Sequence, residues 1–381
     1  MISLKFTKHF GTRMILLAVF LLPLLAGFTT PVRADNDDDG AHRAVYTITN
    51  AAAGNEVVVL RRENNGSLSM QESVSTGGLG SGAGLGSQGA VILSENGRWL
   101  FVVNAGSNQI SVFSVKKNGL TLTDVVDSGG IMPISLTTHG RILYVLNTGE
   151  NGNISGFRIR ENGKLAPLDG STQPLSNGGT GASPQPAQVS FSQNGDLLIV
   201  TEKMTNLIDV YEVNDGIAGP PVTNTSAGMT PFGFAFDKRG HLIVSEAFGG
   251  APGASAMSSY ALNVNTFNVI SPSVGTTQTA ACWVVISKNG RYAYTTNTGS
   301  GSISSYKINQ DGAITLLNAQ AGLTGDGSSP LDMALSNNGT YLYAIGAGSH
   351  AISIFRVREN GSLESVGEVS VPAGSLGLAA R

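Results

Sequence analysis

The sequence is poor in cysteine and in charge. Its single cysteine, Cys282, excludes an internal disulfide and every metal or iron–sulfur site that needs several cysteines. Charged residues make up 13% of the chain, about half of the roughly 25% found in an average domain, which excludes a coiled coil or a helical bundle. Neither a His-Glu-x-x-His motif nor a Gly-x-Ser-x-Gly elbow is present. Zinc-peptidase and serine-hydrolase chemistry therefore have no support in the sequence.

Glycine and apolar residues are abundant instead. The 50 glycines are about double the usual share of roughly 7%. Hydrophobic residues reach 41% with a formal net charge of only -3, so the chain can fill a core and is not a disordered one. A length of 381 residues exceeds the usual single-domain range, but one regular all-β body can reach this size.

The first 34 residues have the pattern of a secretory signal peptide. A basic start (Lys5, Lys8 and Arg13) precedes an apolar run over 14–28, and Val32-Arg33-Ala34 is a small-x-small cleavage site. The run is shorter than the roughly 20 apolar residues that a spanning helix needs. We therefore expect a secreted or periplasmic protein whose mature chain has no membrane span.

Residues 35–43 form an acidic tail. Its segment 35–40, Asp-Asn-Asp-Asp-Asp-Gly, matches the first half of a calcium loop, but the position of the bidentate glutamate is occupied by Tyr46, which favours a solvated tail. Removal of the signal peptide takes away basic residues and no acidic one, so the mature chain is more acidic than the whole. This balance argues against a nucleic-acid partner or an anionic membrane surface. We expect a monomer with a small-molecule ligand.

The body of the chain repeats one hairpin. Each copy has an apolar strand, a polar turn that ends in glycine, and a second apolar strand. The copies occupy residues 90–103, 134–146, 189–201, 234–245, 284–296 and 333–345, with turn glycines at positions 97, 140, 195, 240, 290 and 339. Glycine allows the positive φ with which two antiparallel strands reverse in a short turn.

A second hairpin follows the first in most copies, so each unit supplies four antiparallel strands at the spacing of propeller blades, about 40 to 50 residues. The two ends are complementary: residues 44–50 resemble a second strand without a first, and residues 372–380 a first strand without a second. Residues 44–381 are therefore predicted to form an all-β, seven-bladed β-propeller in which strands from both termini close one blade. A β-sandwich or an open solenoid would not explain the complementary half-units.

A glycine-rich run separates the first two units. Residues 77–89 (GGLGSGAGLGSQG) lack the following helix and the Lys-Ser/Thr of a phosphate-binding loop. We interpret the run as a mobile connection into the second blade and as a candidate lid over the channel mouth.

Several second strands end in an aromatic residue, two small or apolar residues and asparagine: Tyr294-Thr-Thr-Asn297, Tyr144-Val-Leu-Asn147 and Phe101-Val-Val-Asn104. These segments resemble the YVTN repeat of surface and secreted propellers. With the repeat, the sequence over 44–381 resembles the seven-bladed lactonase family, which includes propeller-type bacterial 6-phosphogluconolactonases and fungal carboxymuconate lactonising enzymes. The resemblance implies lactone chemistry at the central channel.

One segment departs from that family. Its fourth unit often opens with a Ser-Pro-His-Pro-His-Gln-Val-like segment, whereas this chain has Gln185 and Ala187 in place of both histidines. An Asp-Leu-Gly segment of the family is represented by Glu202-Lys203-Met204, so a carboxylate is kept there. The predicted export also disfavours a phosphosugar substrate, because such intermediates are kept in the cytoplasm.

Lactone hydrolysis needs a base that activates water and a donor or cation that stabilises the oxyanion. Glu202 as base and Lys203 as oxyanion partner are the catalytic candidates; a turn-capping Glu202 and a surface Lys203 stay open as the alternative. The substrate-binding candidates follow second strands (Asn104, Asn147, Glu246 and Asn297) or open innermost strands (Gln185, Gln188, Trp283 and Asp332). All of them are expected at one face or in the channel.

No metal or other cofactor is predicted as required. A variant hypothesis uses oxygen ligands to hold a hard cation such as calcium, which would polarise the carbonyl. Its ligands would be Glu202, Asn104, Asn147, Asn297 and Asp332.

The leading prediction is thus an exported propeller that hydrolyses an unphosphorylated lactone or related cyclic ester at the channel mouth. The alternative is a non-catalytic propeller that binds a small molecule or a protein and has lost the family's histidines. Gln185 and Ala187 favour the alternative, while Glu202, Glu246 and Lys203 favour the enzyme.

Overall fold

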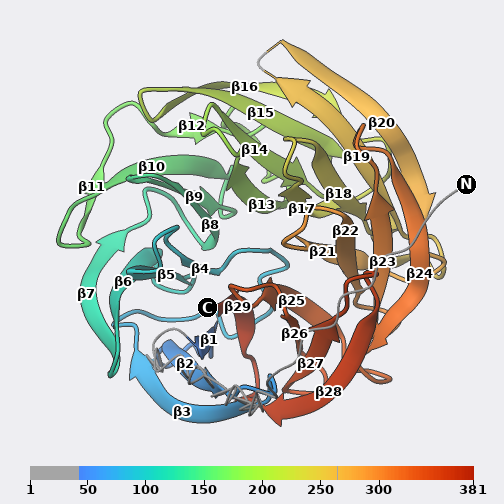
Figure 1. Cartoon of the computed structure of the whole chain (residues 1–381). Helices are drawn as coiled ribbons and strands as arrows, with labels where there is room; N and C mark the ends of the chain where they lie inside the picture. Colours follow the sequence, from blue (N-terminus) through green and yellow to red (C-terminus); the bar gives the residue numbers. More distant parts are fainter. Residues whose placement is uncertain (1–42, 264) are drawn as a thin grey trace, which may run out of the picture. The chain divides into compact units, whose positions relative to one another are not determined.

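The computed structural model describes residues 43–263 and 265–381. Within these residues the strands form seven antiparallel sheets, arranged as the blades of a ring (Figure 1). The predicted signal peptide (1–34) and nearly all of the predicted acidic tail (35–43) lie outside the described residues.

Each blade has an innermost, a second, a third and an outer strand. The innermost strands of blades 1 to 7 are β29 (Leu376–Ala380), β4 (Val91–Leu93), β8 (Pro133–His139), β13 (Pro186–Phe191), β17 (Pro231–Phe236), β21 (Ala281–Ile286) and β25 (Pro330–Leu335). The second strands, in the same order, are β1 (Ala44–Ile48), β5 (Trp99–Asn104), β9 (Ile142–Asn147), β14 (Leu197–Glu202), β18 (Leu242–Glu246), β22 (Tyr292–Asn297) and β26 (Tyr341–Gly346).

The remaining strands follow in chain order. The third strands are β2 (Glu56–Arg62), β6 (Gln109–Lys116), β10 (Asn153–Ile159), β15 (Leu207–Asn214), β19 (Ala256–Asn263), β23 (Ser302–Ile308) and β27 (Ala351–Val357). The outer strands are β3 (Leu68–Ser75), β7 (Gly119–Asp127), β11 (Leu165–Pro167) with β12 (Gln173–Pro174), β16 (Ile217–Thr225), β20 (Thr266–Gly275), β24 (Ile314–Leu323) and β28 (Leu363–Ser370).

The innermost strands close the ring. Each contacts the innermost strand of the next blade, in the circuit β4, β8, β13, β17, β21, β25 and β29. In blade 1, β29 pairs with β1, and the Arg381 N–H bonds to the carbonyl of Ala44 at 2.9 Å. The prediction that strands from both ends of the chain share one blade is thereby confirmed.

The glycine turns define two faces of the ring. All six turn glycines have positive φ, from 56° at Gly140 to 87° at Gly240. We call the face that carries these turns the turn face. The opposite face, where innermost strands begin and second strands end, is the loop face.

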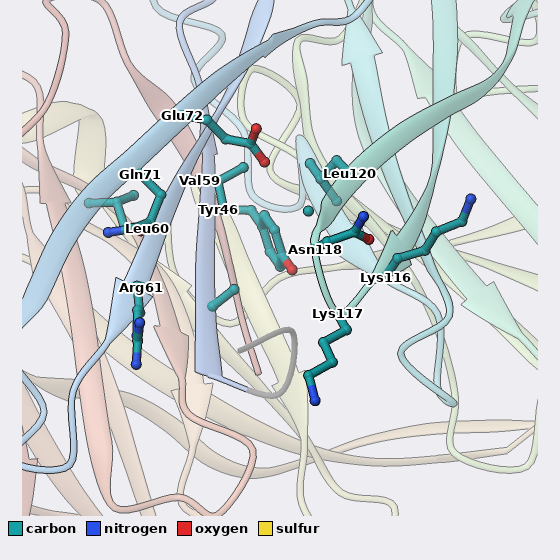
Figure 2. A pocket seen from close by; sticks show the side chains of 12 residues that line it. Tyr46, Val59, Leu60, Arg61, Gln71, Glu72, Lys116, Lys117, Asn118 and Leu120 are labelled. Atoms are coloured by element: carbon teal, nitrogen blue, oxygen red, sulfur yellow. The ribbon is translucent and has the colours of Figure 1, made fainter. Parts of the chain in front are cut away.

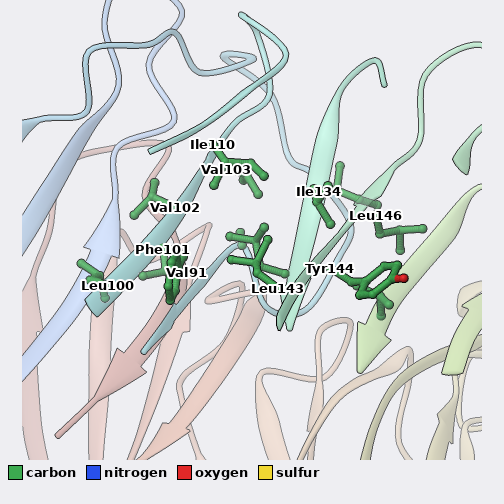
Figure 3. Close-up of a cluster of buried hydrophobic side chains, with 14 of the residues drawn as sticks. Val91, Leu100, Phe101, Val102, Val103, Ile110, Ile134, Leu143, Tyr144 and Leu146 are labelled. Carbon is green, nitrogen blue, oxygen red and sulfur yellow. The ribbon is translucent and has the colours of Figure 1, made fainter. Parts of the chain in front are cut away.

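The core lies between neighbouring blades. The apolar residues of blades 2 and 3 pack against one another, among them Val91, Phe101, Ile134 and Tyr144 (Figure 3). Glycines in the outer turns let aromatic rings of the preceding blade approach: a Cβ at Gly163, whose φ is +82°, would lie 2.4 Å from the Trp99 ring. These close contacts fix each blade against the next.

Helical structure is minor in the described part of the chain and includes the short 3-10 helix η2 (Phe248–Gly250). None of the described residues forms a helix that is long and apolar enough to cross a membrane.

Candidate active site

The centre of the ring holds a polar cavity of about 320 Å³. Its walls come from the innermost strands of blades 1, 2, 3, 4 and 7 and from the segment just before β4. The cavity extends toward the turn face, where its lining includes Glu95, Thr138 and Ser190. Near the starts of the strands it is lined by Gln88, Gln188 and Asp332. Two of the predicted substrate-binding residues, Gln188 and Asp332, therefore line the same cavity, and their role in binding stays a prediction.

Asp332 places a carboxyl group at the inner end of this cavity. Its side chain is 2% exposed and accepts hydrogen bonds from the N–H groups of Met333 (2.8 Å) and Leu378 (3.3 Å). Burial raises the pKa of Asp332 to about 7, and backbone hydrogen bonds from Met333, Leu378 and Gly89 oppose the rise. A carboxyl group with such a pKa takes up and releases a proton near neutrality.

The side-chain amides of Gln88 and Gln188 each hydrogen-bond to the backbone of an innermost strand. The Gln88 amide donates to the Val284 carbonyl at 2.8 Å and accepts from the Val284 N–H at 3.0 Å. Gln188 makes the same pair of bonds with Phe234. A primary amide has two N–H groups, so each glutamine keeps one donor beyond the bond to its strand.

The glycine-rich run closes the channel at the loop face. Gln88 precedes β4 of blade 2, but its side chain bonds to Val284 of β21 in blade 6 and its N–H bonds to the Ala187 carbonyl in blade 4. Ser87 donates to the Ile134 carbonyl and accepts a bond from the indole N–H of Trp283, both at 2.8 Å. The run therefore lies where a lid was predicted, but the channel end of it is tied to blades 3, 4 and 6. We call residues 85–88 the strap.

The strap packs closely against blade 5, at a position where only glycine fits. A Cβ at Gly233 would lie 2.4 Å from Oε1 of Gln88 and 2.6 Å from the carbonyl oxygen of Cys282. Any larger residue would push the strap away from the innermost strands. With the strap in place, the turn face is the side from which the cavity can be reached.

Lys203 lies above the strap. Its ammonium group donates to the Gly86 carbonyl at 2.6 Å and lies 4.9 Å from the centre of the Phe232 ring. Burial lowers the pKa of Lys203 to about 8, and a nearby Cys282 opposes the change. The structure thus uses Lys203 to hold the strap, while its predicted role as oxyanion partner stays a prediction.

Two further candidates lie near the strap and not in the cavity. Gln185 is exposed, with a φ of 53°, and its carbonyl accepts the Lys203 N–H at 3.2 Å. Trp283 is 3% exposed and packs 5.0 Å from the Phe232 ring, measured between ring centres. Of the two, Trp283 contacts the strap directly, through its bond to Ser87.

The predicted asparagines are all at the loop-face ends of second strands, but each is fully buried within its own blade. Asn104 donates to Ser111 Oγ at 2.7 Å and accepts from Asn55 and from Thr76 Oγ1 at 3.0 and 2.7 Å. Asn147 donates to Asn153 and Asn297 to Ser302 and Ser304. Buried polar groups need such partners, so these asparagines join strands and loops.

Glu202 occupies the same position in blade 4 and is also fully buried. Its carboxylate accepts the N–H of Ser176 at 3.0 Å and the hydroxyls of Ser176 and Thr205, both at 2.5 Å. Asp209 lies beside it, fully buried, and neither of its carboxylate oxygens accepts a hydrogen bond from the described residues. The role of Glu202 as base stays a prediction, and the burial of its carboxylate weighs against it.

Asp209 has an unusual environment. Burial and the adjacent Glu202 raise the pKa of Asp209 to about 9, against the influence of the Ser176 backbone and the Tyr211 side chain. Burial beside Glu202 therefore favours the protonated form of Asp209. Sequence reasoning missed Asp209, although it occupies the position of Ser111 in blade 2.

Glu246 is the equivalent residue of blade 5. It is fully buried and accepts hydrogen bonds from the hydroxyls of Ser258 and Ser273, the latter at 2.6 Å. Burial raises the pKa of Glu246, and these hydroxyls oppose the rise. Glu246 does not line the channel cavity.

The ligands of the calcium hypothesis are spread over the ring. The structure places Glu202, Asn104, Asn147 and Asn297 in four different blades, and Asp332 in the channel. Among residues 43–263 and 265–381, no group of three or more His, Cys, Asp or Glu side chains is arranged to hold a metal ion. The structure does not bring these five residues together.

Comparison with known proteins agrees with the observed fold, a seven-bladed propeller. Residues 39–176 and 256–376, more than half of the chain, match the family described as lactonase, 7-bladed beta-propeller. No curated protein matches this chain.

Solved structures with a similar fold include three that cover nearly the whole propeller. A "putative 6-phosphogluconolactonase" from Bacteroides fragilis has a TM-score of 0.66 at 20% identity, covering 89% of this chain and 98% of its own. The periplasmic gluconolactonase of Pseudomonas aeruginosa has a TM-score of 0.64 at 16% identity, covering 88% and 98%. A Lactobacillus plantarum protein reaches 0.70 at 15% identity, covering 88% and 98%.

At these identities the solved structures establish the fold alone, while the family match extends over both halves of the ring. The chain therefore belongs to the lactonase family of seven-bladed β-propellers.

Proposed function

We propose that this protein hydrolyses an unphosphorylated lactone or related cyclic ester in the channel cavity, with Asp332 as the general base. The observation that carries the proposal is that Asp332 lines the same cavity as Gln88 and Gln188. A volume of about 320 Å³ falls within the range of small-molecule pockets, about 300–1,000 Å³.

The reaction uses groups that already lie in the cavity. Ionised Asp332 takes a proton from water, and the resulting hydroxide attacks the lactone carbonyl. The second N–H of Gln88 or Gln188 donates to the oxyanion that forms. The ring C–O bond then breaks, the leaving oxygen takes up the proton that Asp332 removed from water, and a hydroxy acid is released. Because a base must be ionised to act, the rate should rise with pH through about 7 and then level off.

The test is acid release from a panel of sugar, aryl and acyl-chain lactones in a pH-stat. Asp332→Asn should lower kcat by roughly 10²- to 10⁴-fold, the usual contribution of a general base. Asp326→Asn, which removes an exposed carboxylate on the loop face, is the matched control and should retain the wild-type rate.

Glu202→Gln separates the two candidate bases. Full activity in Asp332→Asn together with loss in Glu202→Gln would overturn the proposal and favour the base predicted from the sequence. Thermal unfolding and circular dichroism of each variant distinguish lost catalysis from lost folding.

A non-catalytic binding propeller is the second candidate function. The observation that favours it is the use of both channel glutamines by backbone groups, together with Gln185 and Ala187 where the family has histidines. In that case the lactones would raise the melting temperature of wild type and of Asp332→Asn equally, with no acid released by either.

The place of action and the assembly state also belong to this proposal. The signal-peptide pattern at residues 1–34 supports export to the periplasm or the medium, and we propose an exported monomer with a small-molecule substrate.

A further inference from the structure

The lysines and arginines of the propeller are segregated. Among residues 43–263 and 265–381, every one except Lys203 lies in the turn-face half of its blade, as the strand directions show. The loop-face half carries carboxylates instead, among them Asp127, Glu150, Asp326 and Glu368, all exposed. The turn face is therefore rich in cations although the chain as a whole has a net negative charge.

Two grooves on the turn face flank blade 2. The first, of about 330 Å³ between blades 1 and 2, is lined by Arg61, Lys116, Lys117 and Glu72 (Figure 2). Figure 2 shows the Lys116 and Lys117 side chains on one side of this groove and those of Arg61 and Glu72 on the other.

The second groove, of about 620 Å³, lies between blades 2 and 3. Its lining includes the cations Arg98, Arg141 and Arg160, the half-buried indole of Trp99 and the carboxylates Glu95 and Glu161. The Arg98 guanidinium lies 5.9 Å from the centre of the Trp99 ring, and Arg141 Nη1 lies 3.7 Å from Glu161 Oε1. All three arginines are exposed.

We propose that these two grooves form a binding tract for an acidic polysaccharide, a chain of sugars that carry carboxylates. Arginine forks bind carboxylates through paired N–H groups, and the sugar hydroxyls can donate to Glu95 and Glu161. The indole of Trp99 adds a flat apolar surface in the same groove.

Nucleic acid fits this tract less well. Its closely spaced phosphates attract uninterrupted cations, about one charge per 1.7 Å of duplex, whereas carboxylates interrupt both grooves. A flat bilayer would meet the rims of the grooves and leave their walls uncovered. The amides Gln71 and Asn118 in the first groove and Asn96 in the second add further hydrogen-bonding groups. This mixture of cations, carboxylates and amides matches a ligand that carries both charges and hydroxyl groups.

The test uses oligogalacturonate as the probe and the fluorescence of Trp99 as the readout. Because the other tryptophan, Trp283, is 3% exposed, a change in fluorescence on binding should be lost in Trp99→Phe. We expect saturable binding that weakens with salt, and none to neutral dextran of equal length.

Charge-removing variants locate the tract. Arg141→Gln combined with Arg160→Gln should weaken binding tenfold or more. Lys238→Gln combined with Arg239→Gln removes the same charge from the turn face of blade 5 and should change binding less than twofold. The fluorescence readout involves no turnover, so this test is independent of the proposed function, and both double variants should keep whatever lactone-hydrolysing activity the wild type has.

Three results would overturn the proposal. The first is an equal loss of binding in both double variants, which would indicate net charge alone. The second is no binding of oligogalacturonate at low salt. The third is tighter binding of a single-stranded DNA oligomer or of phosphatidylglycerol vesicles at equal charge, which would assign the tract to another partner class.

Discussion

Blades 2 and 4 fill the same buried position with different chemistry. In blade 2, Asn104 and Ser111 form a neutral pair whose donors and acceptors are matched. In blade 4, Glu202 and Asp209 stand in the same strand register and form an acid pair. The Glu202 carboxylate is well supplied with donors, whereas Asp209 receives none from the described residues.

The difference shows that the propeller geometry does not require one kind of side chain at this turn. The hydrogen bonds of the neutral pair do not depend on pH, whereas the burial of Asp209 is favourable only while Asp209 holds a proton. Blade 4 should therefore respond to pH in a way that blade 2 does not.

The largest effect should appear in the pH dependence of stability. The pKa of Asp209 is raised to about 9 in the folded chain, above its ordinary value of 3.8, so the folded state keeps a proton that the unfolded state loses. This group's contribution therefore falls as pH rises from about 4 to about 9, by about 1.4 kcal/mol per pH unit.

Asp209→Ser, which copies Ser111, should remove that slope. Denaturant unfolding at pH 5 and pH 8 measures it, and the free-energy difference between variant and wild type should change by about 4 kcal/mol across this interval. A difference that stays constant between the two pH values would show that Asp209 is ionised in the folded protein.

The next effect compares the first members of the two pairs. Glu202→Ala leaves three buried donors without their charged acceptor, and should destabilise the fold by about 3–5 kcal/mol. Asn104→Ala should cost less, about 1–3 kcal/mol, because only neutral groups are left unpaired. Urea unfolding at pH 6 measures both, and equal costs would contradict the distinction between the two blades.

Blade 5 offers an intermediate case and the smallest effect. Glu246 has two serine hydroxyls as donors and its third-strand neighbour is Ser258, not an acid. Glu246→Gln should therefore change the free energy of unfolding by no more than about 1 kcal/mol at pH 6. A loss as large as that of Glu202→Ala would mean that the charge, and not the acid partner, sets the cost.

The architecture was predictable because local sequence patterns determine it. Alternating apolar residues, the turn glycines from Gly97 to Gly339 and the two half-units at the ends determine the blades and their closure without any knowledge of distant contacts. The same patterns placed Asn104 and Glu202 correctly at the ends of second strands.

Where those side chains point was not predictable in the same way. Asn104 bonds to Thr76 in the loop after the preceding blade, and Glu202 to Ser176 in an irregular segment, so their burial depends on loops that carry no periodic signal. The bond between Gln88 and Val284 spans 196 residues and joins blades across the ring. A sequence pattern indicates that residues 77–89 are rich in glycine, but not that the strap closes one end of the channel.

The closing blade has a consequence for how the chain is made. Strand β1 is among the first parts of the propeller to be synthesised, yet its partner β29 comes only with residues 376–380. Throughout translation the inner edge of β1 lacks this partner, and an unpaired edge can join the edge of another nascent chain. A premature stop shortly before residue 376 would remove few core residues, but it would leave the inner edge of β1 permanently unpaired in an open ring. Such truncated chains should be recognised by their self-association before any loss of their secondary structure.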